Sequence, residues 1–417
     1  MPDRAAGRGA GPWLAGLCLS RFLLAFVFTS YAGVLPVLQG EWQMSAAAAG
    51  AVASAFQIGF ALSLVGFNLL ADRIGARPAF LWSSLAAAPA ALAFAVFADG
   101  PASAALLYGL TGLSCGGNYT PGLMLIAERF PAATRGRATG FFLAATSIGY
   151  AASLLLTGEV LARAGWRWAL VAASLGPVLG AGVAAWTVHG MPTRVHPRGV
   201  GQGFSSEVLR NPGALLLTAA YTCHSWELLG MWAWTPAFLS AALMRGGQEL
   251  GTATGGGARL SALFHLTGFL ASATTGALSD RLGRTTVILG MLAVSTACSL
   301  AFGWLIAAPF WLLLAVGLVY GFSAVGDSPV LSVALTEAVA PPLLGSALAV
   351  RSLLGFGAGA AAQWAFGVVL DATNAGRPYA TWGWAYGLLA AGGAAGVAAT
   401  AWLRGRPESR RFTGGRR

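Results

Sequence analysis

Twelve long apolar runs dominate this sequence. Each has roughly the 20 residues that an α-helix needs to cross the hydrocarbon core of a bilayer. The runs span 13–38, 44–70, 78–98, 102–127, 138–162, 166–189, 212–243, 258–279, 285–306, 310–336, 347–370 and 378–403. A backbone in lipid must satisfy its hydrogen bonds internally, so we expect each run to fold as a spanning helix. The sequence therefore predicts an all-α integral membrane protein with twelve transmembrane helices.

Composition supports a lipid-embedded chain. Of the 417 residues, 56% are hydrophobic and 9% are charged, whereas soluble domains carry about 25% charged residues. The formal charge of +11 comes entirely from arginine, and most arginines lie between the apolar runs rather than in a phosphate-binding patch. We therefore expect a lipid bilayer, and no nucleic acid, as the surrounding partner.

Chemistry-bearing clusters are not apparent in the sequence. Cys18, Cys115, Cys223 and Cys298 each lie inside an apolar run, and no two have metal-ligand spacing. No nucleophile elbow or phosphate-binding loop is present. We expect no metal site, no cofactor and no enzymatic activity.

The arginines also predict the orientation. With both termini in the cytoplasm, eighteen arginines fall on the inner side and five on the outer side, and the other two lie within spans. Cytoplasmic loops carry the excess of basic residues. We expect a multi-pass protein of a bacterial-type inner (plasma) membrane, with both termini cytoplasmic.

The chain reads as two halves. A cytoplasmic tail, 1–12, precedes a six-helix bundle, 13–189; a cytoplasmic linker, 190–211, leads to a second six-helix bundle, 212–403, and a basic cytoplasmic tail, 404–417. The stretch Leu70–Gly75 recurs as Leu278–Gly283, with Asp, Arg and Gly at matching positions. This repeat predicts two pseudo-symmetric bundles.

The loop motifs carry a family resemblance. Gly276 to Arg284 reads GALSDRLGR, and Asn68 to Arg77 reads NLLADRIGAR. Together with Glu128-Arg129-Phe130-Pro131 and Gly165-Trp166-Arg167-Trp168, these loops resemble those of the major facilitator superfamily of secondary transporters, across nearly the whole chain. The resemblance departs at Tyr108 and Tyr150, where proton-coupled members often have Arg and drug antiporters Pro.

The two loop copies are candidate gates. Gly75 and Gly283 permit tight turns, and Asp72 and Asp280 can accept hydrogen bonds from a helix N-terminus. The resemblance implies a latch between the bundles; the alternative is plain anchoring at the lipid headgroups. The candidate gating residues are Asp72, Arg73, Gly75, Gly276, Asp280, Arg281, Gly283 and Arg284.

Acidic and imidazole groups inside the runs predict proton coupling or charge balance, because charges in a membrane are expensive. His224 and Glu227 are three residues apart, on one helix face. They could relay a proton, or form a structural pair. Asp327, followed by Ser328 and Pro329, is either a proton or cation site or the cap of a helix break.

Arg21 and Arg351 are candidate anion ligands, because a guanidinium suits a carboxylate or phosphate. Both lie towards the inner side, so snorkelling to the headgroups is an alternative. For Arg351, pairing with Asp327 or Glu227 is another.

Further polar and aromatic side chains are weaker candidates for contact with substrate. They either line a central path or bond and pack neighbouring helices, and they are Gln57, Asn118, Tyr119, His265, Trp226 and Trp232.

These features predict a secondary transporter, expected as a monomer, that moves a small-molecule substrate by alternating access. The membrane arginines favour a small organic anion of carboxylate type, coupled to protons. Proton-antiport efflux of an amphipathic drug-like compound is the alternative within transport. Outside transport, a non-transporting membrane sensor or assembly factor remains open.

Overall fold

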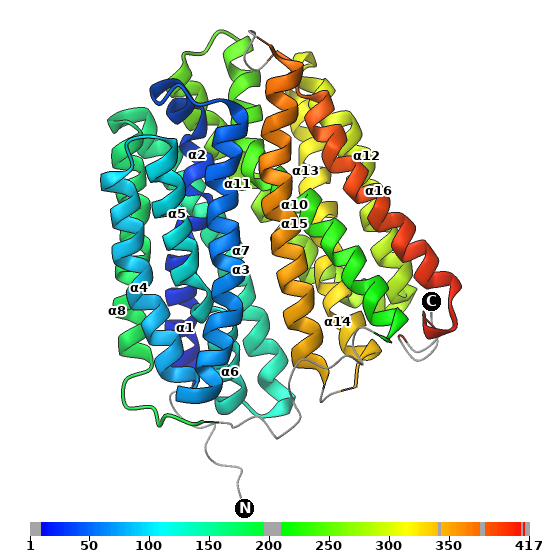
Figure 1. Cartoon of the computed structure of the whole chain (residues 1–417). Coiled ribbons are helices and arrows are strands. Elements are labelled where there is room, and N and C mark those ends of the chain that lie inside the picture. Colours follow the sequence, from blue (N-terminus) through cyan, green and yellow to red (C-terminus); the bar gives the residue numbers. More distant parts are fainter. Residues whose placement is uncertain (1–9, 196–209, 341–342, 376–379, 410–411, 413–417) are drawn as a thin grey trace, which may run out of the picture.

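The protein is described from a computed structural model, which covers residues 10–195, 210–340, 343–375, 380–409 and 412. Within these residues all the regular structure is helical, arranged as two groups of roughly parallel helices that stand side by side (Figure 1). The start of α1 and the end of α16 lie towards the same end of the molecule, here called the terminal end. The opposite end is called the far end.

The first bundle holds the elements before the linker. They are α1 (Ala10–Leu24), α2 (Phe26–Glu41), α3 (Ala46–Ile74), α4 (Ala76–Phe97), α5 (Pro101–Cys115), η1 (Gly116–Asn118), α6 (Thr120–Arg129), α7 (Ala132–Ala164) and α8 (Trp166–Thr187).

The second bundle holds the elements after the linker. They are α10 (Pro212–Arg245), α11 (Leu250–Leu282), α12 (Arg284–Phe302), η2 (Gly303–Ala307), α13 (Phe310–Gly326), α14 (Ser328–Ala338), α15 (Leu344–Thr373) and α16 (Gly383–Gly405). Most of the predicted linker, residues 196–209, lies outside the described residues, as does most of the predicted tail beyond Ser409.

Three of the predicted spans are interrupted helices rather than continuous ones. The breaks fall at Ala25 between α1 and α2, at η1 and Tyr119 between α5 and α6, and at Asp327 between α13 and α14. The prediction of a span from residue 258 was also wrong at its start, because α11 begins at Leu250. The sequence before residue 258 is polar and rich in glycine, so its hydropathy did not predict the first two turns of α11. Arg259 therefore lies well within this helix and not at its start.

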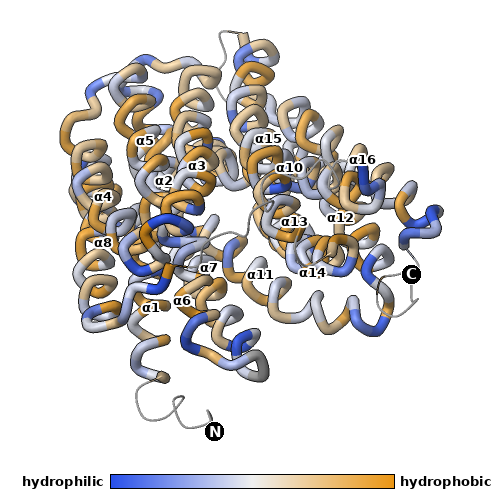
Figure 2. The backbone as a smooth tube through the Cα atoms, turned by 60° about the horizontal axis from the view of Figure 1, so that its bottom comes forward, coloured by the Kyte–Doolittle hydropathy of each residue, from blue (hydrophilic) through white to orange (hydrophobic). Residues whose placement is uncertain are grey.

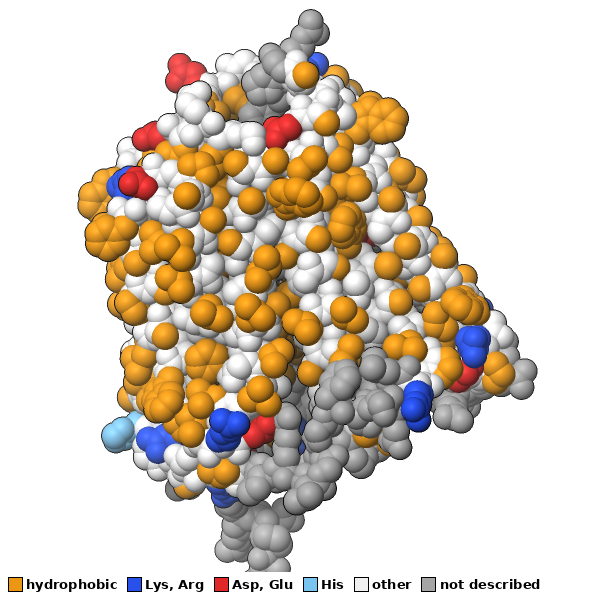
Figure 3. Space-filling view, in the orientation of Figure 1, with side chains coloured by type: hydrophobic (Ala, Val, Ile, Leu, Met, Phe, Trp, Pro, Cys, Tyr) orange, Lys and Arg blue, Asp and Glu red, His pale blue; other side chains and the backbone are white. Residues whose placement is uncertain are grey.

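The lateral surface is suited to lipid. In the described part of the chain, nine helices are long and apolar enough to cross a membrane. Apolar side chains cover the middle of the face in Figure 3, and charged ones lie near its two ends. The backbone view of Figure 2 likewise shows hydrophilic segments gathered at the ends of the helices.

Tryptophans mark the ends of several helices. Six are more than half exposed and lie within three residues of a helix end or in η2, as expected of aromatic belts at the membrane interface. They are Trp168, Trp186, Trp304, Trp311, Trp384 and Trp402.

The two bundles contact each other through α3 with α15 and α7 with α11. Asp371 near the end of α15 accepts hydrogen bonds from the amides of Ala46 and Ala47, both at 2.8 Å. A carboxylate at a helix N-terminus is stabilising, so this contact caps α3 from the other bundle. The Ser54 hydroxyl donates to the Ala360 carbonyl two turns further along.

The contact between α7 and α11 lies in the same half of the molecule as the contacts between α3 and α15. A Cβ on Gly255 would lie 2.6 Å from the Gly158 carbonyl, so the two backbones touch. Beside them Arg259 pairs with Glu159 at 2.7 Å. These inter-bundle contacts therefore close the far end, and towards the terminal end α3 and α15 lean apart (Figure 1).

The two candidate gating loops turn as predicted. Gly75 and Gly283 have φ of +92° and +93°, which a side chain would disfavour. In the second loop Arg284 donates to Asp280 at 2.6 Å and to Glu337 of α14 at 2.9 Å, both within its own bundle. Arg73 and Arg281 are exposed, and Gly276 lies inside α11 with open space around it.

The α3–α15 contact predicts a matched pair of variants. We expect Gly367→Ala to lower the melting temperature by several degrees, because its Cβ would collide with the Ala46 carbonyl; overpacking costs about 1–3 kcal/mol. Gly357→Ala, on the exposed face of the same helix with open space, should leave it unchanged. Thermal unfolding in detergent compares them, and equal melting temperatures would contradict the close contact.

Candidate functional site

Arg21 lies inside the first bundle. Its side chain is 3% exposed, its Nε donates to Thr146 Oγ1 at 2.8 Å, and its Nη1 donates to Asn118 Oδ1 at 3.3 Å. Its guanidinium also lies 5.1 Å from the ring centre of Tyr119. No carboxylate lies within ion-pairing distance of it in the described part of the chain.

Asn118 acts here as a support for Arg21. It is fully buried, and its amide nitrogen donates to Ser84 Oγ at 3.2 Å while its oxygen accepts from the arginine. The irregular η1 segment, between α5 and α6, is what aims the Asn118 side chain at α1. Of the polar residues predicted to line a path, Asn118 and Tyr119 thus converge on Arg21. Gln57 lies instead on the face of α3 that also carries Gly50 and Ser54, towards α15.

Arg351 is the corresponding cation of the second bundle. It is 8% exposed, its Nη1 donates to Ser332 Oγ at 2.8 Å, and its guanidinium lies 4.2 Å from the ring centre of Tyr221. Its buried Nε has no hydrogen-bond partner among the described residues. The predicted alternative, an ion pair with Asp327 or Glu227, does not occur there.

We call Arg21 and Arg351 the arginine pair, and each of the two packs against a tyrosine ring. Tyr119 lies beside Arg21 in the first bundle, and Tyr221 lies beside Arg351 in the second. Arg21 lies about 16 Å along its helix from Ala10, and Arg351 about 10 Å along α15 from Leu344, at 1.5 Å per residue. Both cations are therefore well inside the bundles, which argues against snorkelling for either one.

The acids do not pair as the spacing predicted. His224 Nδ1 lies 2.7 Å from Asp327 Oδ1, so the histidine contacts the acid of the α13–α14 break rather than Glu227. Asp327 makes no side-chain cap of α14. Both residues are at most 3% exposed. The Asp327 carboxylate at the helix break therefore faces α10 instead of capping α14.

Glu227 points into the interior of the second bundle. Its Oε2 accepts from Ser295 Oγ of α12 at 3.1 Å, and a Cβ on Gly393 of α16 would lie 2.6 Å from it. Its other oxygen, Oε1, has no hydrogen bond in the described residues. A buried carboxyl with no cation beside it is best accommodated with a proton.

Aromatic side chains separate the arginine pair from the far end. Tyr150 of α7 touches both Trp232 and His265, at 5.5 Å between ring centres in each case, and Phe60 touches Phe356 across the bundles at 5.1 Å. Phe28 joins the two groups through Phe60 and Tyr150. We call Phe28, Phe60, Tyr150, Trp232, His265 and Phe356 the aromatic layer. His265 and Trp232 belong to this layer.

Trp226 lies away from the junction of the bundles. Its indole nitrogen donates to the Leu388 carbonyl at 3.2 Å, and its ring packs on Gly392 of α16. It holds α10 against α16, which is the packing alternative that the sequence left open.

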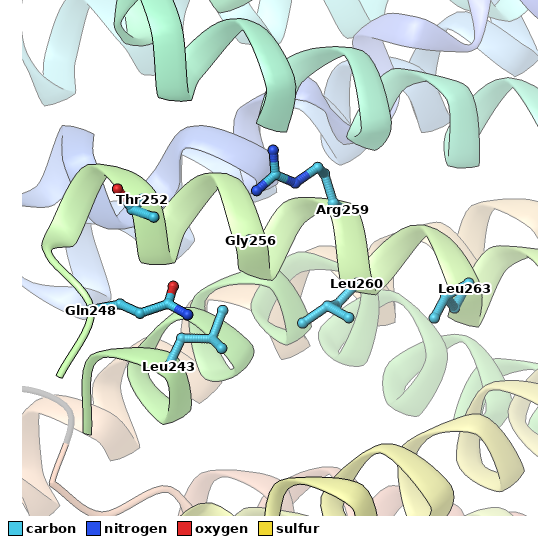
Figure 4. Close-up of a pocket in the computed structure, with 7 residues that line it drawn as sticks. All are labelled: Leu243, Gln248, Thr252, Gly256, Arg259, Leu260 and Leu263. Carbon is cyan, nitrogen blue, oxygen red and sulfur yellow. The ribbon is translucent and has the colours of Figure 1, made fainter. Parts of the chain in front are cut away.

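A surface pocket lies elsewhere. Figure 4 shows Leu243, Gln248, Thr252, Gly256, Arg259, Leu260 and Leu263 between the end of α10 and the start of α11. Because Arg259 is engaged by Glu159, this pocket belongs to the closed far end and not to the arginine pair.

Sequence reasoning missed Thr146, Tyr221 and Ser332, which contact the two arginines. Thr146 and Ser332 carry no signal of their own, since hydroxyls are common in membrane helices. Tyr221 stands three residues before His224, and that helical spacing was the signal that could have found it.

The described residues thus form a two-bundle, multi-pass membrane protein whose junction is approached by unpaired buried cations and a buried acid–imidazole pair. A family model for the Major Facilitator Superfamily matches residues 17–253, more than half of the chain. The chain belongs to this superfamily of secondary transporters, and it is a transporter and not an enzyme.

Curated relatives match only parts of the chain. A quinolone resistance transporter of Acinetobacter baumannii is 33% identical over 165 residues, or 38% of each chain. A gallate transporter of Pseudomonas putida is 29% identical over 35% of this chain and 32% of its own. The niacin transporter NiaP of Acinetobacter baylyi is 28% identical over 39% and 36%. Each match therefore spans less than two-fifths of the relative's length.

Solved structures agree in fold over nearly the whole chain. The nucleoside transporter NupG superposes with a TM-score of 0.75 at 16% identity, covering 94% of this chain and 99% of its own. A D-xylose–proton symporter superposes with a TM-score of 0.73 at 18% identity, covering 95% and 98%. At such identities the likeness establishes the fold alone.

The environment of Arg21 predicts the effect of one isosteric change. Asn118→Asp would place a carboxylate beside the Arg21 guanidinium, which has no carboxylate partner among the described residues. Hydrogen bonds to charged groups are worth about 1.5–3 kcal/mol. We expect the melting temperature to rise by several degrees. Asn68→Asp, half-buried on α3, should bring no rise. Destabilisation by Asn118→Asp alone would show that Arg21 is already compensated.

Proposed function

We propose that this transporter moves a small organic anion of the carboxylate type, coupled to protons, by alternating access. The observation that carries the proposal is the arginine pair, two buried guanidiniums without a carboxylate partner in the described part of the chain. A buried unpaired cation is costly, and a substrate carboxylate would supply the missing charge to both bundles.

The chemistry of the named relatives supports a carboxylate. Gallate and niacin, the substrates printed in the names of two relatives, are both aromatic rings that bear one carboxylate. The aromatic layer beside the arginine pair offers faces on which such a ring can stack. Tyr119, Trp232 and His265 are the side chains proposed to contact the ring, with Gln57 on the α15-facing side of α3.

Protons are proposed to enter through the acids of the second bundle. Asp327 and His224 form a pair, and His224 packs on Tyr221, which in turn contacts Arg351. Glu227 is the other buried acid of this bundle, and it interacts electrostatically with Asp327. Protonating this group offsets the negative charge that a substrate anion brings into the membrane.

The transport cycle is proposed to be a rocking of two six-helix bundles, twelve spans in all, in a bacterial-type inner membrane. With both termini cytoplasmic, the closed far end would face outward. The gating loops would form their latch between the bundles when the terminal end closes. We propose that a monomer carries out the cycle.

Efflux of an amphipathic compound in exchange for protons is the second candidate. The observation that favours it is the quinolone resistance transporter among the relatives. Quinolones also carry a carboxylate on an aromatic system, so the two candidates differ mainly in direction.

The test of anion recognition uses purified protein and the probes benzoate, nicotinate and lactate. We expect Arg351→Gln and Arg21→Gln each to weaken binding at least about tenfold, since a charge-assisted bidentate contact is worth about 1.5–3 kcal/mol. Arg163→Gln, at the exposed end of α7, is the matched control. Unchanged binding in both buried variants would rule the arginine pair out as the anion site.

The test of coupling uses proteoliposomes with a trapped pH dye. We expect an inward anion gradient to acidify the lumen with wild type, and Glu227→Gln and Asp327→Asn to abolish this signal while folding normally. Counterflow of labelled anion should persist in these variants, because it needs no net proton movement. Proton exit on addition of an amphipathic cation would instead favour efflux, and unchanged acidification in both variants would remove the acids from the mechanism.

A further inference from the structure

One tyrosine lies between the anion-binding and the proton-binding groups of the second bundle. The Arg351 guanidinium lies 4.2 Å from the Tyr221 ring centre, and the His224 ring lies 5.5 Å from the same ring at an interplanar angle of 36°. His224 in turn meets Asp327 at 2.7 Å. The four side chains therefore form a continuous row from cation to carboxylate.

The position of the Tyr221 ring is determined by α15. A Cβ on Gly355 would lie 2.5 Å from Cε1 of Tyr221, so the ring rests directly on the backbone one turn beyond Arg351. Arg351 is itself held by Ser332 of α14 at 2.8 Å. The ring is thus confined directly by α15, and α14 contributes by holding Arg351.

The other titratable groups in the middle of the helices packed on α10 have different neighbours. His265 of α11 faces Tyr150 and Trp232, and Tyr31 of α2 faces Phe94 and Tyr108. Tyr320 of α13 donates a hydrogen bond to Ser299, and Tyr386 of α16 contacts Thr235. Cys298 of α12 interacts electrostatically with Glu227. The groups that face His224 are therefore Asp327 and Tyr221, with Arg351 beyond the tyrosine and Glu227 one turn along α10.

We propose that Tyr221 is a positioning residue that makes the anion on Arg351 and the proton on the His224–Asp327 pair bind cooperatively. The proposal rests on the proposed function, and it assigns a role to a residue that neither binds the proton nor carries charge. Its ring holds the two charges one aromatic ring apart in a site of low dielectric, where charges interact strongly.

Cooperativity follows from the signs of the charges. A proton on His224 adds positive charge beside Arg351 and strengthens its hold on an anion. By thermodynamic reciprocity the bound anion raises the proton affinity of the pair by the same factor. Removing the ring lets Arg351 and His224 move apart, which weakens the coupling between them.

The experiment measures the Kd of benzoate, nicotinate and lactate at pH 8 and pH 6, where their carboxylates stay ionised. For wild type we expect binding to tighten at least about fivefold at the lower pH, the low end of typical coupling between sites. Tyr221→Phe should keep this change because it keeps the ring, whereas Tyr221→Leu and His224→Gln should reduce it to less than about twofold.

Two further variants keep the test independent of misfolding. Gly355→Ala keeps all four residues but pushes the Tyr221 ring out of its place, so it should also flatten the pH response. Tyr119→Leu removes the ring beside Arg21, 5.1 Å from its guanidinium. It should weaken binding at both pH values equally, because the acid–imidazole pair is in the other bundle.

The outcomes separate the two proposals. A full pH response in both Tyr221→Leu and Gly355→Ala, or in His224→Gln, would overturn the role of Tyr221 while leaving the anion site intact. Failure of every probe to bind wild type, or unchanged binding in both Arg351→Gln and Arg21→Gln, would overturn the anion function and this inference with it. Unchanged binding in Arg351→Gln alone would overturn only this inference.

Discussion

The burial of positive charge without a local counter-charge is the constraint on which the proposed function of this protein depends. Arg21 and Arg351 are each held by hydroxyl or amide oxygens and by aromatic faces, and not by carboxylates in the described residues. Such contacts orient a guanidinium without neutralising it. A site built this way is stable enough to fold and still has electrostatic free energy to gain from an anion.

The closed end depends on a different interaction, the direct contact of helix backbones. Gly158 against Gly255, and Gly367 against Ala46, bring the bundles together without intervening side chains. Small residues allow this because dispersion forces, rather than the hydrophobic effect, hold helices together in lipid. Polar contacts at Asp371 and Arg259 lie at the exposed edge of this contact. They are reversible interactions, suited to an interface that opens in the proposed transport cycle.

Much of the architecture was predictable because its signals are local. Apolar length determines a span, and Gly75 and Gly283 determine a turn through their positive φ. The pairing of buried polar groups was not predictable, because it depends on rotation about helix axes and on helix breaks. The spacing placed His224 with Glu227, yet the helix break at Asp327 brings that carboxylate to His224, while Glu227 turns towards Ser295. Asn118 likewise reaches Arg21 only because η1 is irregular.

The sequence by itself determined the class of this protein: apolar runs and arginine-rich loops specify a multi-span membrane protein, because membrane insertion reads hydropathy and charge locally. The repeated loop motif predicted two bundles, and the resemblance of the loops to a known family implied transport. Only the tertiary structure decided which buried groups are paired and which are left without a counter-charge. It separated Trp226, a packing residue, from Trp232 at the junction, and it revealed Tyr221 between Arg351 and His224. Most of those assignments depend on distances between residues that are far apart in the sequence, which no local pattern encodes.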